Sequence, residues 1–188
     1  MMRVNIYDFD GTIYDGDSTI DFWKHCIKKY PMVLCAFPSA LVFGILNQLK
    51  LCERSVFKEK FYAFLKYVPD VEKEVSCFWD THLNRIKDFY RKRHRVDDLV
   101  ISASPDFLVG EACSRLGISC ITSKVAPDTG RLLGPNCRGA EKLRLFREKF
   151  PQASIDEFYS DSFSDACLAE IARCAFFVKK NNVRKWSL

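Results

Sequence analysis

Two carboxylates, Asp8 and Asp10, stand two residues apart directly before Gly11 and after the apolar run that ends at Ile6. The run predicts a short buried strand, at whose end both acids would project to the same side. Gly11 lets the chain turn there, so a ligand can approach the backbone closely. Two acids this close repel each other unless a cation lies between them or one keeps its proton. The pair therefore indicates a hard cation such as Mg2+, a nucleophile beside a general acid, or both.

Taken alone, an Asp-x-Asp-Gly sequence is also typical of a surface turn after an edge strand. Three later stretches favour chemistry instead, because each places polar residues at the end of an expected strand or at the start of an expected helix. Sites in open parallel sheets lie at the carboxyl ends of the strands, so we expect these residues to meet the first acid pair. They are Ser102, Lys142, Asp161 and Asp165.

Apolar runs alternate with helix-length segments after residue 97, which predicts an α/β fold with an open parallel sheet. The expected strands are 97–101, 118–122, 155–159 and 175–178, and the expected helices are 107–116, 138–150 and 166–173.

The segment from residue 13 to residue 96 is expected to be an insertion of mostly helical structure. Asp17 or Ser18 would cap its first helix, and Pro31 would end that helix. Residues 30–49 contain no charged side chain, and about 18 such residues is the usual sign of a membrane span. A single crossing would separate Asp8 from the later motifs. We therefore favour apolar helices buried in a small bundle, with an interfacial helix pair resting on a membrane as the alternative.

The composition sets broad limits on the class of protein. With 188 residues, 48% of them hydrophobic, the chain can form one packed domain, with or without a sizeable insertion. A net charge of +5 permits anionic partners and does not demand nucleic acid. Nine cysteines without a Cys-x-x-Cys pair indicate reduced core cysteines in a cytosolic protein. The start of the chain predicts no signal peptide, and the oligomeric state is left open.

A phosphoryl group is one ligand that all of these polar residues could handle. Asp8 could attack phosphorus, and Asp10 could protonate the leaving oxygen and later take a proton from water. Asp161 with Asp8 could hold Mg2+. Ser102 and Lys142 could bind the phosphoryl oxygens. The sequence has no G-x-x-x-x-G-K-[ST] motif, so a P-loop nucleotide hydrolase is unsupported.

Four stretches resemble, in order and spacing, the motifs of the haloacid dehalogenase-like superfamily, in its phosphoserine-phosphatase-like branch. They are Asp8-Phe-Asp-Gly-Thr12, the apolar run to Ser102, Gly139-Ala-Glu-Lys142 and Asp161-Ser-Phe-Ser-Asp165. The resemblance implies a Rossmann-like catalytic core formed by residues 1–12 and 97–188, with residues 13–96 as an inserted α-helical cap. It also implies a Mg2+-dependent phosphatase that acts through an aspartyl phosphate.

Carried over by position, the resemblance makes Asp8 the nucleophile and a metal ligand. Asp10 would be the general acid and base, and its backbone carbonyl would bind the metal. Asp161 would complete the metal ligands, with Asp165 supporting them. Ser102 and Lys142, with the turn at Gly11, would bind phosphate. Ser104 and Ser162 are expected to make only local hydrogen bonds, as hydroxyls in such loops usually do.

Departures from the pattern bear on the substrate. Phosphoserine phosphatases usually carry Glu where Asp17 stands, and they use a cap arginine, yet no arginine occurs between Arg54 and Arg85. The apolar segment 30–49, followed by Lys58, is more similar to branch members that include bacterial phosphatidylglycerophosphate phosphatases. We expect a phosphomonoesterase for a small phosphorylated substrate. The alternatives are a lipid-phosphate phosphatase peripheral to the inner face of the membrane and a phosphoryl-ligand sensor without turnover.

Overall fold

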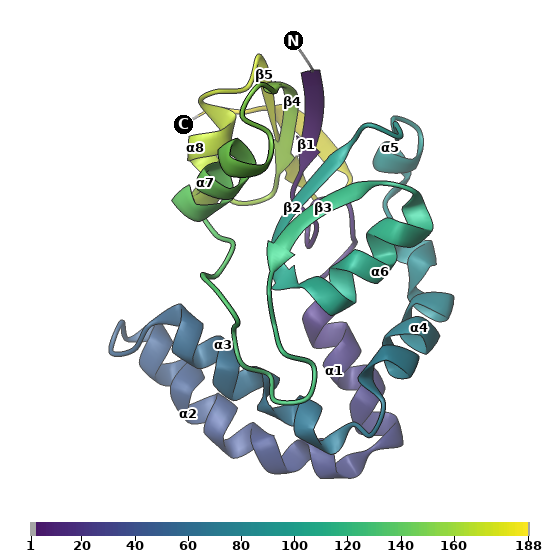
Figure 1. The fold of residues 1–188 in the computed structure, drawn as a ribbon, viewed down its shortest axis with the longest axis vertical. Coiled ribbons are helices and arrows are strands. Elements are labelled where there is room, and N and C mark those ends of the chain that lie inside the picture. The colour runs from purple at the N-terminus through teal and green to yellow at the C-terminus, as the bar shows by residue number, and fades with distance from the viewer. Residues whose placement is uncertain (1–2, 188) are drawn as a thin grey trace.

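The computed structural model describes residues 3–187. Its centre is one six-stranded sheet with the order β3-β2-β1-β4-β5-β6 (Figure 1). The strands are β1 Arg3–Tyr7, β2 Leu99–Pro105, β3 Ser119–Ser123, β4 Ser154–Ser160, β5 Cys174–Lys179 and β6 Asn182–Lys185. Strands β1 to β5 pair in parallel, so the predicted α/β fold with an open parallel sheet is confirmed.

Strand β6 departs from the prediction, because it pairs antiparallel with β5 at the edge of the sheet. Its four residues are mostly exposed, and its sequence, Asn-Val-Arg-Lys, lacks an apolar run. A short, charged edge strand gives no hydrophobic pattern from which it could be predicted.

Two hydrophobic clusters cover the two faces of the sheet, because successive side chains of a strand point to opposite faces. In β1, Ile6 belongs to one cluster and Tyr7 to the other. Helices α7 (Ala140–Lys149) and α8 (Ala166–Ala169) pack on the face of Ile6, and α6 (Asp106–Leu116) packs on the face of Tyr7. The sheet is therefore buried on both sides, which fixes the strand ends that carry the polar residues.

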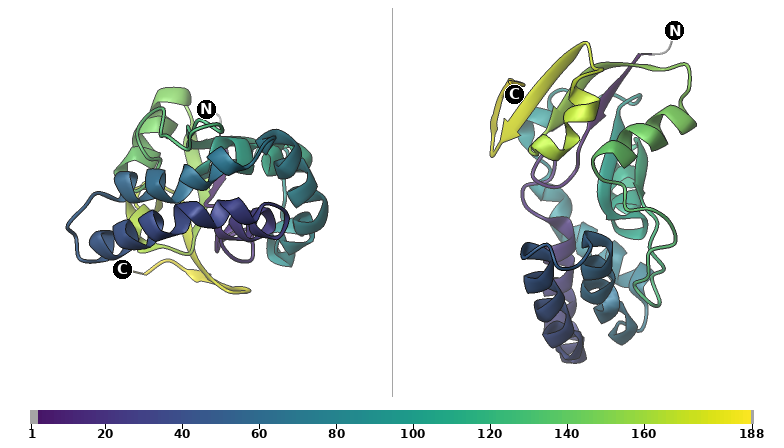
Figure 2. Two further views of the ribbon diagram at one scale, coloured as in Figure 1. Left: turned by 90° about the horizontal axis from the view of Figure 1, so that it is seen from below. Right: turned by 90° about the vertical axis from the view of Figure 1, so that its left-hand side faces the viewer.

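The chain between β1 and β2 forms a set of helices that we call the inserted helices. Their bounds are α1 Ser18–Lys29, η1 Pro31–Ala36, α2 Phe37–Gln48, α3 Arg54–Tyr62, η2 Ala63–Tyr67, α4 Val71–His82, η3 Leu83–Arg85 and α5 Asp88–Arg91. Helices α1, α2 and α3 lie at the end of the molecule opposite to the N and C labels (Figure 2), whereas α5 lies beside the strands.

One hydrophobic cluster runs from the inserted helices into the sheet, since Phe22 and Phe78 belong to the same cluster as Tyr7 and Leu108. The indole of Trp79 on α4 also donates a hydrogen bond of 2.8 Å to the backbone carbonyl of Leu108 on α6. The two-part division predicted from the sequence stays a prediction, and the packing shows that α1 and α4 are joined firmly to the sheet.

Local signals set the ends of several helices as expected. Asp17 caps α1 by accepting a hydrogen bond of 3.0 Å from the backbone N–H of Ile20, and α1 ends at Lys29 before Pro31. Gly117, with a φ of 68°, ends α6 in the left-handed conformation that glycine adopts without strain.

The prediction that the uncharged segment is buried is wrong. The segment Pro31–Gln48 is long and apolar enough to cross a membrane, yet only 17% of it is buried. Ala40 is the single buried residue of α2. The apolar side chains of α2 therefore lie mostly at the surface of the described structure.

Candidate active site

The carboxyl ends of β1, β2 and β4 meet at a pocket of about 330 Å³ between the sheet and α3. Most of the residues singled out in the sequence line this pocket: Asp8, Asp10, Ser102, Lys142, Asp161 and Asp165. A pocket of this size suits a small ligand.

Gly11 does not line this pocket and lies against Asp161 instead. Its φ is 72°, and a Cβ built on it would come within 2.0 Å of Asp161 Oδ2. Glycine is needed here for its backbone conformation and because Asp161 occupies the space of a side chain.

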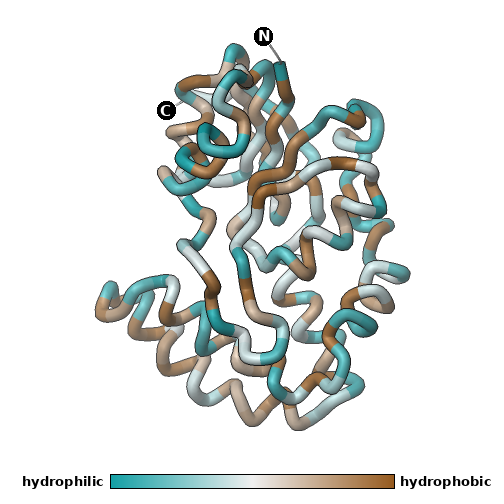
Figure 3. The backbone as a smooth tube through the Cα atoms, viewed as in Figure 1, coloured by the Kyte–Doolittle hydropathy of each residue, from teal (hydrophilic) through white to brown (hydrophobic). Residues whose placement is uncertain are grey.

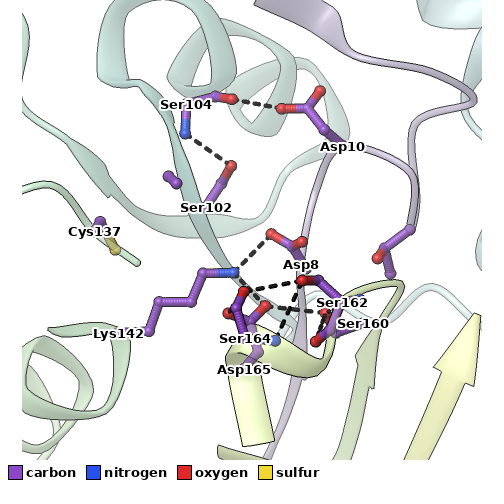
Figure 4. A network of polar contacts seen from close by, with 12 residues as sticks. Asp8, Asp10, Ser102, Ser104, Cys137, Lys142, Ser160, Ser162, Ser164 and Asp165 are labelled. Atoms are coloured by element: carbon purple, nitrogen blue, oxygen red, sulfur yellow. Dashed lines mark hydrogen bonds and ion pairs between the residues drawn. The ribbon is translucent and has the colours of Figure 1, made fainter. Parts of the chain in front are cut away.

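Lys142 links the first and last acidic stretches (Figure 4). Its Nζ donates hydrogen bonds of 2.8 Å to Asp8 Oδ1 and 2.7 Å to Asp165 Oδ2. The Ser160 hydroxyl donates a further hydrogen bond of 2.9 Å to Asp165 Oδ2. Lys142 reaches this position from the first turn of α7 and is 2% exposed. The ammonium is thus held between two carboxylates in a nearly water-free position.

The electrostatics of this network follow from burial and charge. Burial alone would lower the pKa of Lys142, but Asp8 and Asp165 raise it above its usual range, so Lys142 is a cation. Burial raises the pKa of Asp8, and the Lys142 ammonium opposes that rise. Lys142 is therefore positioned to attract a second anion, such as a phosphoryl oxygen, beside Asp8.

Asp10 is held by hydrogen bonds at both of its oxygens. The backbone N–H of Ser18 donates to Oδ1 over 2.7 Å, and the Ser104 hydroxyl donates to Oδ2. Burial, and then the nearby charge of Asp17, raise the pKa of Asp10 to about 7. A carboxyl group with such a pKa can both give and take a proton at neutral pH.

Ser104 makes a long-range contact that the sequence analysis missed. Its backbone N–H does bond locally to the Ser102 hydroxyl, at 3.1 Å, but its own hydroxyl reaches Asp10. Ser162 behaves as expected, since its oxygen accepts from the backbone N–H of Ser164. The signal for Ser104 was its place near Ser102 at the end of β2, next to the strand that leads to Asp10.

Asp161 faces the same pocket as Asp8. Its backbone N–H donates to the Thr12 hydroxyl over 3.0 Å, which ties the loop after β4 to the loop after β1. Burial, and then the charge of Asp8, raise the pKa of Asp161 to about 6. A carboxylate whose pKa is raised by a neighbouring carboxylate marks a place where a cation is favoured.

No three His, Cys, Asp or Glu side chains among residues 3–187 gather closely enough to hold a metal ion by themselves. Mg2+ does not need such a group, because it usually binds one or two carboxylates together with waters and phosphate oxygens. Asp8 and Asp161 therefore fit a magnesium ion as the two carboxylates of such a set.

The opposite side of the pocket is formed by α3, which contributes Arg54, Lys58 and Tyr62. The Nζ of Lys58 donates to the backbone carbonyl of Ala103 at 2.6 Å and to Asn136 Oδ1 at 2.7 Å. Burial, and then the neighbouring arginines, lower the pKa of Lys58 to about 8. With Arg138, which also lines the pocket, these side chains make its far side cationic.

The sequence analysis did not assign Arg54 and Arg138 to the site. A signal for Arg54 was present, because Arg54 and Lys58 are four residues apart and so share one face of a helix. Arg138 stands four residues before Lys142, in the stretch that opens α7. Neither spacing says whether these two side chains point into the pocket. That depends on how α3 and the loop before α7 pack against the rest of the chain.

Comparisons with known proteins agree with this architecture. The model of the family described as haloacid dehalogenase-like hydrolase matches residues 6–170. Among curated proteins, no sequence matches the chain.

Solved structures with low sequence identity share the fold. A protein of unknown function from Bordetella pertussis Tohama I has a TM-score of 0.74 at 16% identity, over 93% of this chain and 89% of that one. A phosphoserine phosphohydrolase-like protein from Francisella tularensis subsp. tularensis SCHU S4 has a TM-score of 0.58 at 16% identity, over 93% and 86%. A structure described as a phospho-aspartyl intermediate analogue of phosphoserine phosphatase has a TM-score of 0.57 at 14% identity, over 93% and 85%.

Proposed function

The chain belongs to the haloacid dehalogenase-like hydrolase family, and on that premise we propose that it hydrolyses phosphomonoesters with Asp8 as nucleophile and Asp10 as general acid and base. The family match confirms the resemblance noted in the four motifs. The observation that carries the proposal is the hydrogen bond from the buried Lys142 ammonium to one oxygen of Asp8, beside the hydrogen-bonded Asp10 carboxyl, in a single pocket.

In the first half of the reaction, Asp8 would attack the phosphorus of the ester. Lys142 holds Oδ1 of Asp8, so Oδ2 is the oxygen that would form the new bond to phosphorus. The bond from phosphorus to the alcohol oxygen breaks, and protonated Asp10 gives its proton to that oxygen. The products are the free alcohol and an aspartyl phosphate at Asp8.

In the second half, Asp10 would remove a proton from a water molecule as the water attacks phosphorus. The bond between phosphorus and Asp8 breaks, which releases inorganic phosphate, a free Asp8 carboxylate and a protonated Asp10. Throughout both halves, Lys142 and Ser102 would bind phosphoryl oxygens, since both line the pocket beside Asp8. The fold shared with the phospho-aspartyl intermediate analogue of phosphoserine phosphatase supports such a step.

We propose Mg2+ as the cofactor, held by Asp8, Asp161 and the backbone carbonyl of Asp10, with Asp165 supporting the set through Lys142. When bound, the ion would offset the repulsion between the phosphoryl group and the two carboxylates. The raised pKa of Asp161, caused by burial and by Asp8, supports a cation at this place.

The test is the turnover of p-nitrophenyl phosphate by an Asp8→Asn variant. We expect kcat to fall by about 10⁴-fold or more, because an amide cannot form the aspartyl phosphate. An Asp97→Asn variant, which alters an exposed acid outside the pocket, is the matched control and should keep its activity. Retained turnover in Asp8→Asn would remove the nucleophile assignment.

A broad panel of phosphate esters, assayed with and without Mg2+, separates turnover from mere binding. The sensor alternative requires that no ester is hydrolysed while inorganic phosphate still raises the melting temperature of the wild-type protein. Hydrolysis of any ester that depends on Asp8 excludes that alternative.

A lipid phosphate is the second candidate substrate, and the exposed apolar surface of α2 favours it. The pocket suits the phosphorylated head group, since it holds only a small ligand. We propose a cytoplasmic location, which the nine free cysteines support, and for a lipid substrate a peripheral attachment to the inner face of the membrane. The ester panel should therefore include a short-chain lipid phosphate.

A further inference from the structure

Hydrophobic residues are concentrated on α2 and on the turns beside it (Figure 3), and many of their side chains are exposed. Of the fifteen large hydrophobic side chains exposed among residues 3–187, eight fall between Met32 and Leu51. Six of them, each 47–70% exposed, form what we call the α2 face: Leu34, Leu41, Val42, Ile45, Leu49 and Leu51. Such concentration on one short segment marks an interaction surface, because scattered exposed apolar side chains are normal and clustered ones are not.

The α2 face is the outward side of a helix that is packed on its other side. Leu41, Ile45 and Leu49 recur every four residues and so lie on one side of the helix. The other side of α2 is packed on α3, where Gly44 leaves room for the ring of Phe57: a Cβ on Gly44 would come within 3.2 Å of it. The helix is thus anchored by one side and presents the other outward.

The charges beside the α2 face are positive. Between Asp21 and Glu53 the sequence has four lysines and no acid, although Lys24 and Lys29 of α1 are paired with Asp21 and Glu74. Lys50 follows α2 directly and is exposed, and Lys60 of α3 lies 5.2 Å from the ring centre of Phe43 on α2. Within the part of the chain that the structure describes, neither of these two lysines forms an ion pair. An apolar helix face flanked by cations complements an anionic lipid surface.

We propose that the α2 face docks onto the surface of an anionic lipid bilayer, with α2 lying in the plane of the interface. A single transmembrane crossing by Pro31–Gln48 is excluded by the fold, although the segment is long enough for one, because Asp8 before it and Ser102 after it line the same pocket. This attachment does not depend on the proposed hydrolysis. It would bring the pocket, whose wall includes α3, close to the lipid surface.

The test is flotation of the full chain with two kinds of vesicle, phosphatidylcholine alone and phosphatidylcholine mixed with phosphatidylglycerol. We expect binding to the mixed vesicles, weaker binding to phosphatidylcholine, and partial loss of binding as the salt concentration rises. The double variant L41E/I45E should lower the affinity for mixed vesicles by about tenfold or more. It should keep its activity towards p-nitrophenyl phosphate, because neither residue lines the pocket.

The matched control is V96E/L133E, which adds the same charge at two exposed apolar residues outside the α2 face. It should bind mixed vesicles as the wild type does. Absence of wild-type binding at low salt would overturn the proposal, and so would equal binding by L41E/I45E and the control. The flotation assay does not depend on hydrolysis. Vesicle binding therefore tests the lipid proposal even if the protein hydrolyses no phosphomonoester.

A second copy of the chain is the other occupant to distinguish. Light scattering after size-exclusion chromatography should give a monomer for both the wild type and L41E/I45E. A wild-type dimer that L41E/I45E converts to a monomer would assign the α2 face to self-association and overturn the lipid proposal.

Discussion

The two sides of the pocket are held in different ways. On the sheet side, Asp8 and Asp10 follow β1 directly and are hydrogen-bonded to Lys142, Ser18 and Ser104. On the other side, Arg54 and Lys58 project from α3, a helix of nine residues without a side-chain cap. The sheet side is therefore fixed by strands buried on both faces. In contrast, α3 is held by the packing of Phe57 on α2 and of Tyr62 in the hydrophobic cluster, together with a few polar contacts.

The few contacts of α3 with the rest of the pocket come from neighbouring residues. Lys58 reaches Ala103 and Asn136, and Glu59 accepts a hydrogen bond of 2.9 Å from the backbone N–H of Leu132. Groups that must meet a reacting phosphorus need tight positioning, whereas groups that select a ligand need only the right charge. We expect changes on the sheet side to lower kcat and changes on the α3 side to raise KM.

Among the variants that compare the two sides of the pocket, Asp10→Asn on the sheet side should have the largest effect. An amide keeps the hydrogen bond from Ser18 but cannot carry the proton, so kcat should fall by about 10³-fold. The loss should be larger for an alkyl phosphate than for p-nitrophenyl phosphate, because nitrophenolate leaves with less need of a proton. Steady-state kinetics on both esters give the measurement, and an equal loss on both would contradict the role of Asp10 as general acid.

The sheet side could be predicted because its signals are local. Each candidate acid, serine or lysine follows an apolar run or opens a helix, and parallel strands bring those ends together. The strand that leads to Asp161 and the helix that starts near Lys142 were both placed correctly. What the sequence did not give was the hydrogen bond from Ser104 to Asp10, because the meeting of two strand ends does not specify which way one hydroxyl points.

A smaller and more selective effect is expected from Lys58→Met. Methionine fills similar space, and the Ser123 hydroxyl still contacts both Ala103 and Asn136. Loss of the cation should raise KM by about tenfold for a phosphomonoester with a second anionic group, such as phosphoglycolate. For p-nitrophenyl phosphate, KM should change little. If both esters lost kcat alike, Lys58 would serve only to join α3 to the sheet.

The α3 side and the α2 face were harder to predict, and the reason is physical. An apolar helix has the same hydrophobic pattern whether it packs in a core or lies exposed, so residues 30–49 were expected to be buried. The orientation of α3, which decides that Arg54 and Lys58 face the pocket, depends on contacts such as Gly44 with Phe57. Such a contact joins residues of two different helices, and the hydrophobic pattern within each helix does not show which residues will meet.

The smallest effect on catalysis should come from Glu74→Gln, which separates the folding of the inserted helices from their role in the pocket. Glu74 on α4 is 1% exposed. It accepts hydrogen bonds from Lys29 at 2.7 Å and Tyr30 at 2.9 Å, and its other oxygen lies 3.1 Å from His25. It therefore ties α4 to α1. The variant should lose about 1–2 kcal/mol of unfolding free energy at neutral pH, with kcat and KM of the folded protein unchanged.

The pH dependence of that loss identifies its cause. Burial alone would raise the pKa of Glu74, but the hydrogen bonds from Lys29, Tyr30 and His25 outweigh burial and hold the pKa below its ordinary value. The carboxylate then stabilises the fold above the pKa of an unfolded glutamate, and the stabilisation is lost as the pH falls through the lower folded value. Urea denaturation should show the difference between wild type and variant shrinking in acid. A difference that stays constant with pH would mean that packing, and not the charge of Glu74, holds α1 to α4.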